Sequence, residues 1–152
     1  MNKVKIAIDC DDAAIKLKDV IYGHVLEKGY DITDLRYTEK KNAPYPEIGY
    51  NLALKIQSGE YSKGILLCGT GLGMAIIANK VKGVYAGVCH DVYSAERLCK
   101  SNNAQIITMG ERVVGPEVAK KVIDAWLESE FTGGGSVSKV ECMHKLEDQS
   151  FH

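Results

Sequence analysis

The chain has 152 residues, enough for one domain with a sizeable core, and its 45% hydrophobic and 26% charged residues are ordinary for a globular protein. Its 19 basic and 20 acidic residues give a net charge of −1, which argues against a nucleic-acid partner or a charged membrane surface. No apolar run reaches transmembrane length, and residues 1–6 lead into a strand without the layout of a signal peptide, so a cytoplasmic protein is expected.

Strand and helix patterns alternate along the chain. Short apolar runs bounded by turns predict strands, and apolar residues spaced three or four apart predict helices. The predicted strands cover residues 4–8, 30–35, 64–68, 84–89 and 105–109, and the predicted helices cover residues 13–28, 47–57, 73–80, 92–100 and 116–130. Because parallel strands need helical crossovers, this order predicts an α/β fold with a five-stranded parallel sheet and helices on both faces.

A glycine-rich joint, Thr132 to Ser136, follows the last of these helices. A further helical pattern covers residues 137–147. The sequence therefore divides into a main domain, residues 1–131, and a tail, residues 132–152, made of a glycine hinge and a C-terminal helix. A helix beyond a flexible joint is a candidate for packing on a neighbouring subunit.

Polar residues gather at the carboxyl ends of the predicted strands, where parallel sheets bind their ligands. The sequence GILLCGTGLG over residues 64–73 places Cys68 at the rim of a glycine-rich loop that opens a helix. Such a loop surrounds an anion with backbone N–H groups, and a helix N-terminus favours the thiolate form of a nearby cysteine. The pattern predicts a site that holds an oxyanion beside a base.

Each of these features also fits a plainer interpretation. Cys68 fits a buried cysteine at a strand end, and His90 fits either an acid–base group or a hydrogen-bonded structural histidine. The glycine-rich loop also fits a dinucleotide fingerprint, because Asp91 follows it by about 20 residues. Against this interpretation, the loop follows the third strand instead of the first, and little chain remains for a substrate domain. Arg112, at the end of the last strand, is available for a phosphate or is solvated.

The acidic residues after the first strand have two further interpretations. Asp11 or Asp12 fits the cap of the following helix. Asp9, Asp11 and Asp12 together suggest a divalent cation, but no matching acidic or histidine cluster stands elsewhere, so no metal is expected.

Five cysteines are spread along the chain without a C-x-x-C pair, which disfavours a disulfide framework and a structural zinc site. Cys10, Cys89 and Cys142 are expected to be packing residues.

Three longer motifs carry a resemblance to a known family. CGTGLGMAIIANK (residues 68–80), KGVYAGVCHDVYSAER (residues 82–97) and MGERVVG (residues 109–115), the last followed by DAWL, resemble the type B ribose-5-phosphate isomerases and the galactose-6-phosphate isomerase subunits. The resemblance extends from Lys5 to about Val140. It implies a Rossmann-like three-layer fold, a dimer or tetramer with the active site between two subunits, and no cofactor. It also implies that a proton moves between C1 and C2 of a sugar phosphate through an enediolate.

The resemblance also implies roles by position. Cys68 would be the base, Thr70 would orient hydroxyls or move the proton between O1 and O2, and Asp11 would contact the sugar hydroxyls. The remaining substrate contacts implied by the resemblance are the amides of Gly69, Gly71, Leu72 and Gly73, together with Asp12, Tyr45, Asn102, Arg112 and Lys139.

The chain departs from the family pattern at four places. Asp12 replaces a histidine, Ser101 replaces the ring-opening histidine, Gly135 and Ser136 replace an arginine and a histidine, and Lys139 replaces a further arginine.

These departures leave the substrate open. Ribose 5-phosphate is the nominal substrate and would need another ring-opening group such as His90. A tetrose 4-phosphate such as erythrose or erythrulose 4-phosphate cannot close a five-membered ring, because its O4 is phosphorylated. The alternative of another class is a non-catalytic sugar-phosphate-binding subunit.

Overall fold

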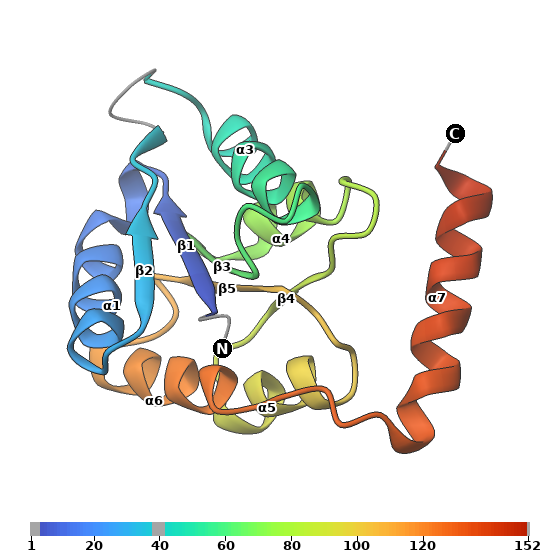
Figure 1. Cartoon of the computed structure of the whole chain (residues 1–152). Helices are drawn as coiled ribbons and strands as arrows, with labels where there is room; N and C mark the ends of the chain where they lie inside the picture. Colours follow the sequence, from blue (N-terminus) through green and yellow to red (C-terminus); the bar gives the residue numbers. More distant parts are fainter. Residues whose placement is uncertain (1–3, 38–41, 152) are drawn as a thin grey trace.

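The computed structural model describes residues 4–37 and 42–151 (Figure 1). In this part of the chain, five strands form one parallel sheet in the order β2-β1-β3-β5-β4, which confirms the predicted sheet. The strands are β1 (Lys5–Cys10), β2 (Asp31–Asp34), β3 (Lys63–Cys68), β4 (Ala86–Val88) and β5 (Ile106–Gly110).

Helices cover both faces of the sheet and complete the predicted three layers. The helices are α1 (Ile15–Glu27, after a 3₁₀ turn at Asp12–Ala14), α3 (Tyr45–Gln57), α4 (Leu72–Ala78), α5 (Val92–Lys100), α6 (Pro116–Leu127) and α7 (Val137–Ser150, after a 3₁₀ turn at Gly134–Ser136). Helices α1, α5 and α6 lie on one face, and α3 and α4 lie on the other (Figure 1).

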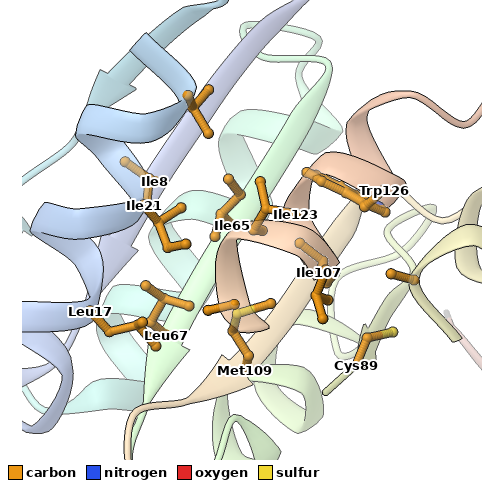
Figure 2. Close-up of a cluster of buried hydrophobic side chains, with 14 of the residues drawn as sticks. Ile8, Leu17, Ile21, Ile65, Leu67, Cys89, Ile107, Met109, Ile123 and Trp126 are labelled. Atoms are coloured by element: carbon orange, nitrogen blue, oxygen red, sulfur yellow. The ribbon is translucent and has the colours of Figure 1, made fainter. Parts of the chain in front are cut away.

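The strands alternate their side chains between two hydrophobic clusters. Ile65 and Leu67 of β3 pack with Trp126 of α6 in one cluster (Figure 2), whereas Leu66 and Cys68 pack on the side of α3 and α4. Each fully buried aliphatic side chain of this kind contributes about 1.5–3 kcal/mol. The alternation turns Cys68 toward α3 and α4 at the carboxyl end of the central strand.

Some element boundaries differ from those predicted. Helix α3 begins at Tyr45, two residues before the predicted start, because Pro46 is tolerated in a first helical turn. Helix α4 ends at Ala78, where the Asn79 amide donates to the carbonyl oxygens of Ala75 and Ala86, both at 2.9 Å. The strand predicted over residues 84–89 is shorter in the structure, where β4 covers only Ala86–Val88.

Helix α7 stands apart from the three layers (Figure 1), and Val140 is its buried residue. Near its end the helix meets the segment before β4: the Tyr85 hydroxyl donates to Glu147 at 2.5 Å, and Lys82 pairs with Asp148 at 3.0 Å. Gly133 has a φ of 81°, which favours glycine and lets the chain turn into this helix. The division of the chain near residue 131 stays a prediction. Within residues 4–37 and 42–151, no helix is long and apolar enough to cross a membrane.

Candidate active site

The loop after β3 folds back on its own cysteine. Cys68 is buried, and its sulfur accepts a hydrogen bond from the Gly71 N–H at 3.0 Å. Gly71 has a φ of 82°, and a Cβ there would lie 2.9 Å from backbone atoms of Met109, so only glycine fits. Thr70 is exposed, and its hydroxyl accepts from the Leu72 N–H at 3.2 Å. The loop thus joins a thiol, an exposed hydroxyl and the first N–H groups of α4, which have no partner within the helix.

The end of β5 forms the second side of the site. The N–H of Glu111 donates to the Cys68 carbonyl oxygen at 3.0 Å, and that of Arg112 donates to Gly69 at 3.1 Å. The Arg112 guanidinium covers Gly69, with one nitrogen 3.2 Å from where a Cβ of that glycine would lie. No residue of the described part hydrogen-bonds or ion-pairs with this guanidinium, so it is available to an anion.

Residues after β1 and at the start of α3 form the third side. The Asp11 N–H donates to the Leu67 carbonyl oxygen at 3.3 Å, and its carboxylate caps the following turn by accepting from the Ala13 N–H at 3.0 Å. The capping interpretation is therefore confirmed for Asp11. Burial raises the pKa of Asp11, and the charge of Arg112 offsets part of that rise.

Tyr45 lies against the start of α4. Its ring lies where a Cβ on Gly73 would be, with ring and hydroxyl atoms 2.5–2.8 Å from that position. Tyr45 also lines a hollow with Asp11 and Asp12. The structure therefore brings Asp11, Asp12, Tyr45, the loop 68–73 and Arg112 together at one edge of the sheet.

Asp9 lies inside the sheet edge. Its carboxylate accepts from the N–H groups of Cys10 at 2.9 Å and Tyr37 at 3.2 Å, which holds the segment after β2 against β1. Burial raises the pKa of Asp9 to about 6. No group of three or more His, Cys, Asp or Glu side chains in residues 4–37 and 42–151 is arranged to hold a metal ion.

His90 and Asp91 both have structural partners. The Nε2 atom of His90 accepts from the Gly110 N–H at 2.9 Å, as the structural interpretation of this histidine predicts. Asp91 caps α5 by accepting from the Ser94 N–H at 2.7 Å. This capping role explains the position of Asp91 without a dinucleotide.

We expect the His90 hydrogen bond to make stability fall in mild acid, because Nε2 accepts only while the imidazole is neutral. The unfolded chain takes up this proton near the ordinary pKa of 6.5, whereas burial lowers the pKa of His90 in the fold and the charge of Asp91 opposes only part of that shift. The contribution is therefore complete above pH 6.5 and is lost as the pH falls below it. His90→Gln keeps an acceptor that does not titrate, so its melting temperature should fall less than that of the wild type between about pH 7.5 and about pH 5. Equal losses in both proteins would contradict this assignment.

Asn102 and Lys139 are not part of this cluster within one chain. Helix α5 runs back along the sheet, so residues 101–105 lie at the opposite edge, where the Gln105 carbonyl oxygen accepts from the N–H of Gly64 at 2.9 Å. Lys139 lies on α7, away from the sheet (Figure 1). The hydroxyl of Ser101 accepts from the Arg97 side chain at 2.8 Å.

The sequence analysis missed Thr108, a buried polar residue whose hydroxyl donates to the Gly71 carbonyl oxygen at 2.8 Å. Its signal was a single polar residue inside the apolar strand IITMG. The cysteine predictions are confirmed for Cys10 and Cys89, which are buried, and wrong for Cys142, which is exposed on α7. Among the described residues, none covers this thiol.

Comparisons with known proteins agree with the geometry. The family model described as ribose/galactose isomerase matches residues 6–143. The chain is 52% identical to the D-erythrulose-4-phosphate isomerase of Pectobacterium atrosepticum, over 98% of this chain and 99% of the relative, and 44% identical to ribose-5-P isomerase B of Listeria innocua, over 97% and 99%. Among solved structures, ribose-5-phosphate isomerase B of Clostridium thermocellum superposes with a TM-score of 0.91 at 37% identity, over 97% of this chain and 100% of that one.

Proposed function

The chain belongs to the ribose/galactose isomerase family, and from this premise we propose that it interconverts the aldose and ketose forms of a short sugar phosphate, with D-erythrulose 4-phosphate as the preferred ketose. The observation that carries the proposal is the Cys68 sulfur, which accepts from the Gly71 N–H at the start of α4 and lies near an arginine whose guanidinium has no partner among the described residues. Cys68 takes the proton from one carbon and returns it to the neighbouring carbon. The loop amides stabilise the charge that develops on the enediolate oxygen.

We assign roles to the other residues of the site from their positions around the Cys68 loop. Arg112 binds the phosphate or the enediolate, since its guanidinium has no partner in the described residues. Thr70 is exposed in the same loop as Cys68 and moves a proton between the two substrate oxygens. Asp11, Asp12 and Tyr45 contact the sugar from the hollow that they share.

Two observations favour a four-carbon substrate over ribose 5-phosphate. Ser101, where the family has its ring-opening histidine, holds no group that transfers a proton at neutral pH and is engaged by Arg97. His90, the other possible ring-opening group, uses Nε2 to accept from Gly110. A tetrose 4-phosphate needs neither group, because its O4 carries the phosphate.

We propose further that two or four copies of the chain assemble, with the active site between subunits. A second copy would have to supply Asn102 and Lys139, which lie away from the Cys68 loop in their own chain. Apolar side chains next to that loop are exposed, including Leu72 at 57%, Ile76 at 63% and Val113 at 56%. A neighbouring subunit that covers them would remove this apolar surface from water.

Incubation of the protein with D-erythrulose 4-phosphate in deuterated water tests the proposal. We expect the aldose to form without added metal or nucleotide and deuterium to enter at the carbon that exchanges its proton through the base. Unphosphorylated erythrulose is the control and should turn over poorly, because Arg112 then has no phosphate to bind. Tight binding of the sugar phosphate with neither product nor deuterium exchange would favour the non-catalytic subunit instead.

A further inference from the structure

Thr108 occupies a place in the sheet that packing alone does not explain. It is completely buried in β5, whose other members are apolar or glycine, and it pairs with Leu66 in the register of β3 and β5. It lies on the same face of the sheet as Cys68. Its hydroxyl donates to the Gly71 carbonyl oxygen at 2.8 Å, so it reaches from the strand into the glycine loop.

Gly71 is fixed against β5 from two directions. The Thr108 hydroxyl holds its carbonyl oxygen, which also accepts the first helical hydrogen bond from the Ala75 N–H at 3.1 Å. On the other side, the Cα of Gly71 lies so close to the backbone of Met109 that no Cβ fits between them. The N–H of Gly71 then lies 3.0 Å from the Cys68 sulfur.

We propose that Thr108 is a positioning residue for Cys68: its hydroxyl holds Gly71 so that the Gly71 N–H is directed at the sulfur. Because the Gly71 N–H donates to the sulfur at 3.0 Å, the position of Gly71 fixes the direction from which the sulfur can react. Thr108 acts through Gly71 and touches no substrate. Its effect on turnover rests on the proposed function, whereas its effect on the thiol does not.

Thr108→Val tests the proposal, because it keeps the shape of the side chain and removes the donor. The readouts are the rate at which iodoacetamide alkylates Cys68, followed on its peptide by mass spectrometry, and kcat and KM for D-erythrulose 4-phosphate. A Cys142→Ser background removes the exposed thiol. We expect alkylation and kcat to fall on the order of ten- to a hundred-fold with little change in KM, since small displacements of a catalytic group have effects of this size. Thr108→Ser should restore both.

Ile107→Val is the matched control. It loosens the same strand by one methylene on the opposite face, so it should lower the melting temperature without changing Cys68 alkylation. A Thr108→Val protein that melts earlier but keeps wild-type alkylation and kcat would overturn the proposal. If Thr108→Val does not fold, Thr108→Ala takes its place with the same expectations. A wild-type protein that isomerises no sugar phosphate would reject the proposed function, and the alkylation rates would still decide the role of Thr108.

Discussion

Cys68→Ala is expected to abolish isomerisation, lowering kcat roughly 10²- to 10⁴-fold or more, because the substitution removes the proposed general base. The fold should survive, since the side chain is 5% exposed and a methyl group still packs beneath α3 and α4. The Gly71 N–H loses its acceptor, which costs about 1–3 kcal/mol of unfolding free energy if the group stays buried. Activity and the thermal melting curve, measured on the same purified protein, separate the two effects.

Cys89→Ala is the matched control for this experiment. Cys89 is also buried, at 4% exposure, but it packs in the cluster of α1 and α6 on the other face of the sheet. The Cys89→Ala protein should lose an unfolding free energy comparable to that lost by Cys68→Ala and should keep wild-type kcat. Wild-type turnover by Cys68→Ala would remove this cysteine from the mechanism and leave the loop amides with Thr70 as the remaining groups.

The second large effect concerns substrate length. We expect kcat/KM to be higher for D-erythrulose 4-phosphate than for ribose 5-phosphate, because Ser101 carries no group that transfers a proton at neutral pH and the Nε2 atom of His90 is engaged by the Gly110 N–H. Ribulose 5-phosphate, which is open-chain, should be handled better than ribose 5-phosphate beyond what the equilibrium constant of the pair requires. Measurement of kcat/KM for the three substrates tests both statements.

Two variants separate this account from ring opening by His90. His90→Ala removes the acceptor of the Gly110 N–H, so it should reduce turnover of tetrose and pentose phosphates by the same factor. Ser101→His removes the hydroxyl that accepts from Arg97 and introduces an imidazole that can transfer a proton. It should raise kcat/KM for ribose 5-phosphate alone. A strong preference for ribose 5-phosphate that disappears in His90→Ala would contradict the four-carbon proposal.

The fold could be predicted from the sequence because its signals are local. Apolar strands such as residues 64–68 and the alternating helices specify a parallel sheet, and the carboxyl ends of its strands specify one edge for the polar residues. Cys68, the glycine loop, Asp11 and Arg112 are brought together for that reason alone. Asn102 and Lys139 could be associated with the site only by resemblance, because helix direction and the tail place them elsewhere in the chain.

Hydrogen bonds between distant segments could not be predicted. The sequence leaves His90 open as an acid–base group or as a structural histidine, with the structural interpretation somewhat favoured. The hydrogen bond to Gly110, which lies 20 residues further along the chain, supports the structural interpretation. Thr108 is similar: one polar residue in an apolar strand indicates a partner but does not identify it. Such contacts depend on the register between β3, β4 and β5, which no single segment specifies.

The glycine loop stands on β3 and β5 inside the sheet, whereas the positions that depart from the family pattern lie on peripheral segments. Asp12 is in the turn before α1, Ser101 ends α5, and Ser136 and Lys139 belong to the tail. A substitution at one of these peripheral positions leaves the core and the Cys68 loop intact. Substrate preference can therefore change during evolution while the reaction at Cys68 stays the same. A protein engineer seeking a new sugar preference would accordingly randomise these outer positions and leave the scaffold under the thiol untouched.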